Sequence, residues 1–168
     1  MINDGCRVTT RRTRHSTRRS RPKTQDYFEH DADIGVIGRG PTLEAAFVAA
    51  AEAVFAIMAE PAALRAPPHA PPCQGGDEGG VAFEFEEPDL ELALVTWLNR
   101  LLAEARSHGL ALCRFQLQRQ GLRWVGRTWG QPWRDDLVRG TEVKGATLTM
   151  LSVRQTAEGW EARCVVDV

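Results

Sequence analysis

Two helix-period patterns set among strand-period patterns constrain the fold of this chain more than any other feature. Apolar residues recur at helical spacing over 42–59, with Thr42 as the N-cap and Pro61 just past the end. A second pattern covers about 90–107 and lies between an Asp89 N-cap and Gly109. Strands are predicted over 27–30, 34–37, 81–86, 112–118, 122–129, 143–154 and 160–168. The order β-β-α-β-α-β-β-β-β predicts an α+β fold, with two helices packed on a mostly antiparallel β-sheet system.

The first 25 residues differ in charge from the rest of the chain. Residues 1–25 contain eight of the 21 Lys and Arg residues and only one of the 22 acidic residues, so 26–168 carries a net charge of −8. The first segment has too little apolar surface to offset its ordering entropy, so we expect a disordered basic tail over 1–25. Residues 26–168 are long enough for a single domain, with a Pro/Gly-rich loop at about 61–80.

Composition also bears on the compartment. No apolar run approaches the roughly 20 residues of a membrane span, and the basic N-terminus never reaches an apolar signal region. The four cysteines lack C-x-x-C spacing, which disfavours zinc and gives no disulfide framework. These features predict a cytoplasmic protein without a membrane partner.

The segment from His30 to Gly35 concentrates chemistry, because it places one imidazole and two carboxylates within four residues. Asp33 precedes an apolar strand, and Asp167 lies one residue before Val168 in the last apolar strand. If these two strands are neighbours, Asp33, Asp167 and the Val168 α-carboxylate converge on an all-oxygen site. Such a site suits Ca²⁺, Mg²⁺ or Mn²⁺, whereas the alternative for Asp33 is an Asx turn and for Asp167 a solvated acid.

Several blocks of the sequence resemble the archease family, in the family's order and over about 27–168. The blocks are His30-Asp31-Ala32-Asp33-Ile34-Gly35, Thr42-Leu43-Glu44-Ala45-Ala46-Phe47, Trp97-Leu98-Asn99-Arg100-Leu101-Leu102, Glu142-Val143-Lys144-Gly145-Ala146-Thr147, and the ending Val166-Asp167-Val168. Each block is weak alone, but together they are specific. The resemblance implies an archease-like version of the α+β fold.

The resemblance also implies a function. Archeases are cytosolic accessory proteins of the GTP-dependent tRNA-splicing RNA ligase; they promote guanylylation of the ligase and its multiple turnover. They are not themselves enzymes, and they reach RNA through the ligase. They bind a divalent cation, seen as calcium, through positions that correspond here to Asp33, Asp167 and Val168.

Two departures from the family pattern affect the site. Asp31 stands where archeases usually have Thr, and the extra carboxylate is a candidate additional metal ligand. Leu148-Thr149 replaces a common Tyr-His pair, so a role resting on that His does not apply here. Lys144 and His30 are candidate contacts for the partner, and their alternatives are a solvent-facing lysine and a structural histidine.

Two other functions compete with this interpretation. His30, Asp31 and Asp33 resemble part of a divalent-metal-dependent phosphohydrolase site, although two of the four histidines fall in the tail and the loop. The Arg-rich tail is typical of an RNA-binding module, because clustered arginines neutralise phosphates.

Overall fold

The computed structural model describes residues 25–30, 33–59, 80–133, 135 and 137–168, with side chains from residue 33 onward. The elements are β1 (Gln25–His30), β2 (Asp33–Gly40), α1 (Leu43–Met58), β3 (Val81–Glu86), α3 (Leu90–His108), β4 (Leu110–Gln120), β5 (Arg123–Pro132), β6 (Gly145–Ala146), β7 (Ser152–Thr156) and β8 (Gly159–Asp167). The predicted basic tail at 1–25 (apart from Gln25) and the predicted loop at 61–80 (apart from Gly80) lie outside these residues.

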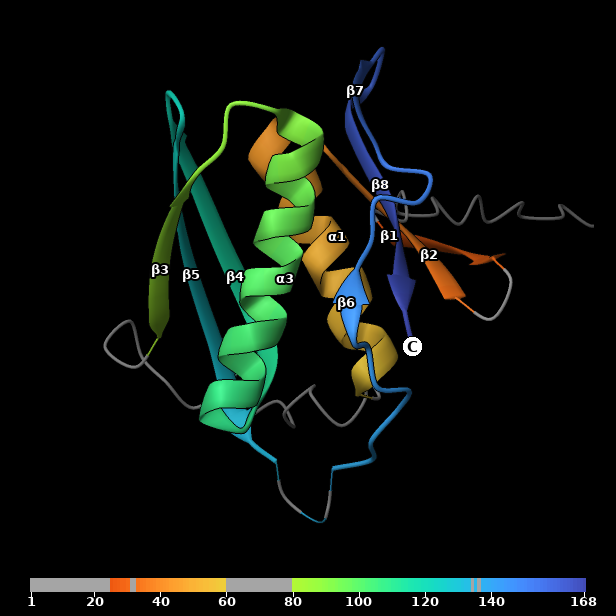
Figure 1. Ribbon diagram of the computed structural model, residues 1–168, viewed down its shortest axis with the longest axis vertical. Coiled ribbons are helices and arrows are strands. Elements are labelled where there is room, and N and C mark those ends of the chain that lie inside the picture. The colour runs from red at the N-terminus through yellow and green to blue at the C-terminus, as the bar shows by residue number, and fades with distance from the viewer. Residues whose placement is uncertain (1–24, 31–32, 60–79, 134, 136) are drawn as a thin grey trace, which may run out of the picture.

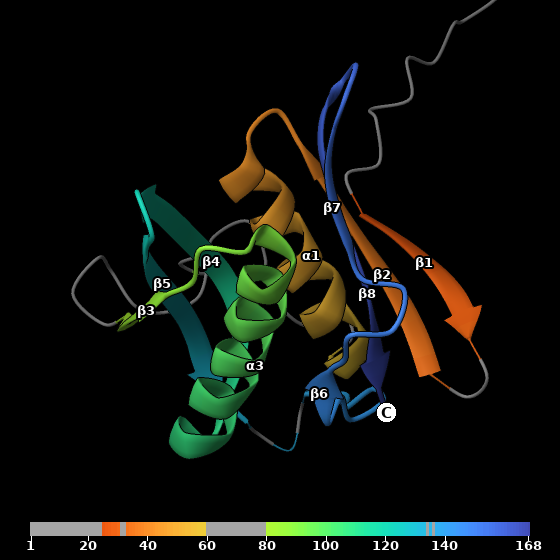
Figure 2. The same cartoon turned by 45° about the horizontal axis from the view of Figure 1, so that its top comes forward.

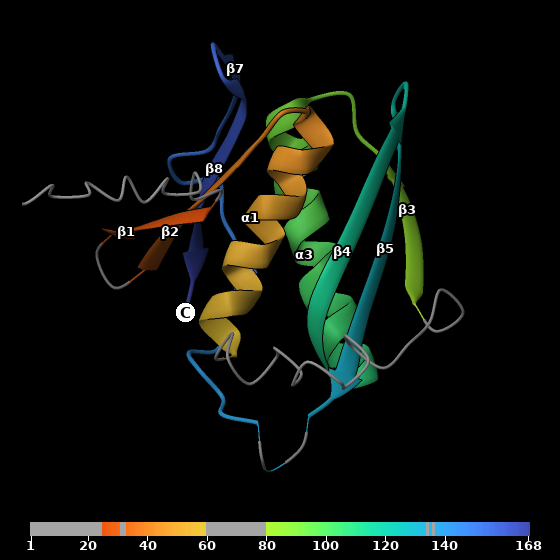
Figure 3. The ribbon, with the colours of Figure 1, turned by 180° about the vertical axis from the view of Figure 1, so that it is seen from behind.

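Two antiparallel sheets enclose the helices (Figure 1). The larger sheet has the order β1-β2-β8-β6, with β7 also paired to β8, and the smaller has the order β3-β5-β4. Figure 3 shows the same arrangement from behind, with α1 in front of α3 and both helices between the sheets. The predicted α+β class is therefore confirmed.

Both helices begin and end as their sequence signals predict. The Thr42 hydroxyl accepts a hydrogen bond from the Ala45 N–H at 3.1 Å, and the Asp89 carboxylate accepts from the N–H groups of Glu91 and Leu92. Gly109 ends α3 with a φ of 62°, in the left-handed region that glycine enters without a steric cost.

The core lies where the two helices meet both sheets. Trp97 of α3 is fully buried and donates its indole N–H to the carbonyl of Phe47 on α1 at 3.2 Å. The ring of Trp124 on β5 stacks on Phe47 and on Phe85 of β3, with centroids 5.3 and 5.9 Å apart. These aromatic contacts join α1, α3 and the smaller sheet into one apolar cluster.

The predicted single strand over 143–154 is wrong, because the chain forms β6 and β7 with an irregular segment between them. The Val165 carbonyl accepts from the Thr147 N–H, whereas the Val165 N–H donates to the Thr149 carbonyl. Val165 of β8 is therefore hydrogen-bonded to two different residues of the segment, Thr147 and Thr149, instead of to one. The extra residues between these two positions form a bulge. Met150 completes this bulge with a φ of 50°.

Two smaller expectations also differ from the structure. The strand predicted over 34–37 is longer in the structure, where β2 continues to Gly40. Cys113 of β4 is disulfide-bonded, although the cysteine spacing predicted no disulfide framework, and its partner lies outside the described residues. No helix in the described part of the chain is long and apolar enough to span a bilayer.

Candidate functional site

Strand pairing brings the two predicted carboxylate ligands together. β2 and β8 are antiparallel, and Ile34 pairs with Val166. Asp33 precedes Ile34 and Asp167 follows Val166. Because the strands are antiparallel, this register sets the two acids opposite each other, one position beyond the Ile34–Val166 pair, and facing residues of such strands lie about 5 Å apart. Figure 2 shows the end of β8 beside the start of β2. We call this group, Asp33, Asp167, Val168 and Lys144, the carboxylate edge.

Lys144 is the cationic member of the carboxylate edge. Its backbone N–H donates to the Asp167 carbonyl at 2.8 Å, and its ammonium Nζ donates to the Val168 oxygen at 2.9 Å. The side chain is exposed. An ammonium therefore already contacts one of the oxygens predicted to bind a cation, and it offsets part of the negative charge there.

The other two predicted residues are only partly placed. His30 of β1 pairs with Asp33 through the strand register, but its side chain is not among those described. Asp31 lies outside the described residues. The phosphohydrolase alternative needs both side chains, so only its Asp33 component has a described position.

The donor chemistry of the carboxylate edge fits a hard divalent cation, because Asp33, Asp167 and Val168 offer only oxygen. Among the described residues, no group of three His, Cys, Asp or Glu side chains could hold a metal ion. A metal site at this edge therefore needs an oxygen beyond the two described aspartates, from Val168 or from Asp31.

Two residues of α3 that sequence reasoning missed hold the segment that carries Lys144. Asn99 exchanges two hydrogen bonds with the backbone of Ala146, and Arg106 donates to the carbonyls of Val143 and Lys144. The two residues are seven apart and thus on one helix face, which was the only available signal.

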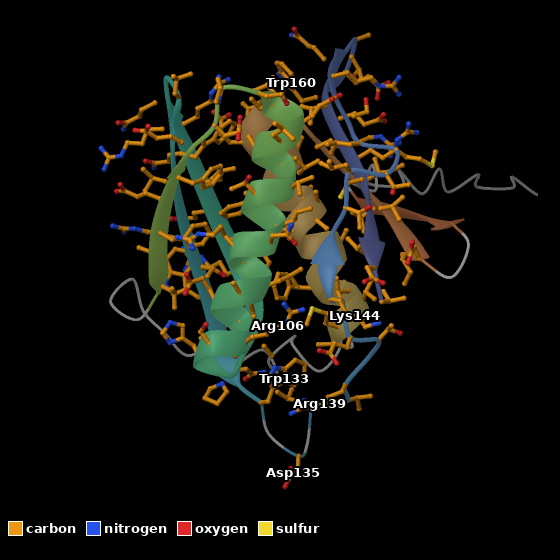
Figure 4. The ribbon with its side chains drawn as sticks, viewed as in Figure 1. Arg106, Trp133, Asp135, Arg139, Lys144 and Trp160 are labelled. Carbon is orange, nitrogen blue, oxygen red and sulfur yellow. The ribbon has the colours of Figure 1, made fainter. Side chains whose placement is uncertain are left out.

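A separate pocket of about 560 Å³ lies below the C-terminal ends of both helices. The ring of Trp133 is covered by the Arg139 guanidinium at 4.7 Å, and the loop is tied to α1 because Gly140 donates to the Met58 carbonyl. Figure 4 shows Arg106, Trp133 and Arg139 around this part of the molecule, with Asp135 at the loop tip. Glu142 lines the pocket and leads directly into the segment that carries Lys144.

The fold and the paired acids define a class of small α+β proteins, and comparison with known proteins agrees. The solution structure of protein 1598 from Methanobacterium thermoautotrophicum superposes with a TM-score of 0.67. The match covers 87% of this chain and 99% of that chain at 23% sequence identity, which supports the fold alone.

Sequence comparison identifies the family. The sequence profile of the Archease protein family matches residues 26–168. The chain is 29% identical to "Protein archease" of Methanosarcina acetivorans over 158 residues, which cover 89% of this chain and 99% of that protein. It is 30% identical to "Protein archease" of Sulfolobus acidocaldarius over 148 residues, covering 85% and 97%. The chain belongs to the archease family.

Proposed function

We propose that this protein is a divalent-metal-binding accessory factor that promotes guanylylation and multiple turnover of the GTP-dependent tRNA-splicing RNA ligase. It acts in the cytoplasm, reaches RNA through the ligase, and is not itself catalytic. Family membership over 26–168 supports an accessory role in RNA processing. The observation that carries the proposal is the register that sets Asp33 beside Asp167.

The proposed metal ligands are Asp33, Asp167 and the carboxylate of Val168, with Asp31 as an additional ligand. Calcium is the proposed ion, and magnesium and manganese have the same preference for oxygen ligands. The bound ion would neutralise carboxylates that otherwise repel one another. Asp33 and Asp167 would hold it between β2 and β8, because these strands fix the relative position of the two acids.

The proposed contacts with the ligase are Lys144 and His30. Lys144 is exposed, and its ammonium is held at the Val168 oxygen, so the charge is presented in a fixed place. A ligase can stall between turnovers if its active site relaxes into a state that cannot be guanylylated. A partner that binds the competent state more tightly shifts that equilibrium by the difference in affinity.

The test combines substoichiometric cognate ligase, GTP, manganese and RNA with cyclic-phosphate and hydroxyl ends. We expect about one product per ligase alone and many products per ligase with this protein. Asp33→Ala should give little activation, and Lys144→Ala a partial loss. Arg127→Ala is the matched control, because it removes an exposed cation from β5, away from the carboxylate edge.

Two results would contradict the proposal. Equal cycling of the ligase with and without this protein would remove the accessory role. Hydrolysis of the RNA ends by this protein alone would favour the phosphohydrolase that uses His30, Asp31 and Asp33.

A further inference from the structure

We infer that α3 sets the geometry of the carboxylate edge through Asn99 and Arg106, which act as positioning residues for Lys144. The inference deepens the proposed function, on which it rests for the role of the edge. The inference can nevertheless be tested separately from the proposed function, because it concerns the hydrogen bonds that hold the segment 143–146 between α3 and β8.

Asn99 takes the place of a further strand beside β6. Its Oδ1 accepts from the Ala146 N–H at 2.8 Å, and its Nδ2 donates to the Ala146 carbonyl at 3.1 Å. Because a primary amide offers both a donor and an acceptor, one side chain satisfies both backbone groups of Ala146. Asp at this position would keep the acceptor but would set a carboxylate against the Ala146 carbonyl.

Arg106 holds the residues just before β6. One terminal nitrogen, Nη2, donates to the carbonyls of both Val143 and Lys144 at 2.7 Å. These short distances are typical of charge-assisted hydrogen bonds, which are stronger than neutral ones. Val143 is fully buried, so the segment is anchored at its start before Lys144 emerges at the surface.

The other side of the same segment contacts β8. Gly145 pairs with Asp167, and Ala146 pairs with Val166. β6 has only two residues, which is too short for ladder bonds alone to fix it. The side chains from α3 therefore complete the support, and the position of the Lys144 ammonium on Val168 follows from both sides.

This arrangement has a consequence for any cation at the edge. The Lys144 ammonium takes up one direction of approach to the Val168 oxygen, so its position decides which directions are left for a metal ion. Removing a residue that orients the ligands of a metal ion typically lowers the affinity of the site for that ion by 10–100-fold. Figure 4 shows Arg106 on α3 and Lys144 across from it.

The test compares Asn99→Leu, Asn99→Asp and Arg106→Met with Arg100→Met. Arg100→Met is the matched control, since it removes an exposed arginine from the same helix that lies over Phe83 instead. Calcium affinity is measured by titration calorimetry, and exchange of the Lys144 and Ala146 amide protons by NMR. We expect calcium binding at least about tenfold weaker in the three variants, and faster amide exchange.

Rescue separates positioning from loss of packing. Arg106→Lys keeps the charge and enough donors for both carbonyls, so it should recover most of the affinity that Arg106→Met loses. Asn99→Asp keeps the size of the side chain, so a loss as large as that of Asn99→Leu identifies the hydrogen bonds as the cause. If an Asn99 variant does not fold, the comparison of Arg106→Met with Arg106→Lys still tests whether the hydrogen bonds from α3 position Lys144.

Three outcomes are distinguishable. Calcium affinity equal to that of Arg100→Met overturns the inference, even if amide exchange accelerates. If the unaltered protein binds no calcium, the metal part of the proposed function fails, and amide exchange alone decides. Accelerated exchange of the Lys144 amide then supports positioning by α3, and unchanged exchange overturns it.

Discussion

Glu161 is a buried carboxylate that joins three strands of the larger sheet. Its Oε2 lies 2.9 Å from Arg39 Nε on β2, and its Oε1 lies 2.6 Å from Arg154 Nη2 on β7. Burial alone would raise the pKa of Glu161, but hydrogen bonds from Arg154 and Arg39 outweigh it and lower the pKa. The charged form is therefore favoured in the folded protein.

This pairing predicts an acid-dependent loss of stability. A lowered folded-state pKa gives stability that is present above the unfolded pKa and is lost as pH falls through the folded value. Glu161→Gln should therefore lower the free energy of unfolding by about 1–3 kcal/mol at pH 7, and by progressively less as the pH falls below 4.5. Urea denaturation at a series of pH values measures this difference.

The control is Glu84→Gln, which breaks an exposed ion pair with Arg123 between β3 and β5. Exposed ion pairs contribute little, so this variant should lose less stability at pH 7 than Glu161→Gln does. A Glu161→Gln penalty that stays constant down to pH 3 would contradict the assignment to charge pairing.

At the scale of single residues, the sequence indicated the two aspartates of the carboxylate edge but not the residues of α3 that hold the segment 143–146. Asp33 and Asp167 were selected as acids beside apolar strands, and their adjacency follows from the register of β2 and β8. Asn99 and Arg106 were not selected, because their hydrogen bonds depend on where 143–146 lies against α3. The seven-residue spacing on α3 places the two side chains on one helix face but does not reveal which segment they contact.

At the scale of elements, close contact between α1 and β2 depends on small residues. A Cβ on Gly38 would overlap the carbonyl oxygen of Ala46 and the nitrogen of Ala50. Ala46 and Ala50 are fully buried and lie one turn apart, so they form the helix surface that meets the strand. The Ala-rich face of α1 is therefore matched to a strand without side-chain bulk at this point.

Gly38→Ala should destabilise the protein, because the overlapping atoms are helix backbone that cannot rotate away. We expect a loss of about 2–3 kcal/mol, measured by urea denaturation. Gly109→Ala is the control: nothing lies within 4 Å of its Cβ position, but its φ is 62°. Its loss should be smaller, about 1 kcal/mol, because an L-residue in the left-handed region carries only this backbone strain. Equal losses would show that the helix can move off the strand.

The elements themselves were largely predictable, with one instructive failure. Helices 42–59 and 90–107 agree with α1 and α3 because cap residues and apolar spacing act locally. The single strand over 143–154 was wrong because its apolar pattern does not report the bulge at Thr147 to Met150. That bulge is imposed by hydrogen bonds to Val165, a residue far along the chain.

At the scale of the whole molecule, the two sheets share none of the described strands and are joined through the helices. The carboxylate edge lies at the end of the β2–β8 pair in the larger sheet, and these strands also supply Val36, Ala162 and Cys164 to the core. A cation bound there would hold two core strands together. Its binding free energy should therefore appear as resistance to global unfolding.

Calcium should raise the melting temperature of the protein. If calcium binds only the folded state, a free calcium concentration of 100 times the dissociation constant raises the free energy of unfolding by about 2.7 kcal/mol. For a chain of this size, this corresponds to a rise in melting temperature of roughly 5–10 °C. Asp33→Ala and Asp167→Ala should abolish the shift measured by calorimetric melting. Asp135→Ala, which removes an exposed acid from the loop tip, should leave it intact. An undiminished shift in both edge variants would place the ion elsewhere.

The amide of Asn99 has a second consequence, for contacts between chains. An open sheet edge is a template for strand addition and aggregation. β6 stands at one end of the strand order, and the backbone groups of Ala146 are taken by a helix side chain. The Asn99 amide therefore closes this edge to a strand from a second molecule, and a chain without it would present a free pairing site at high concentration.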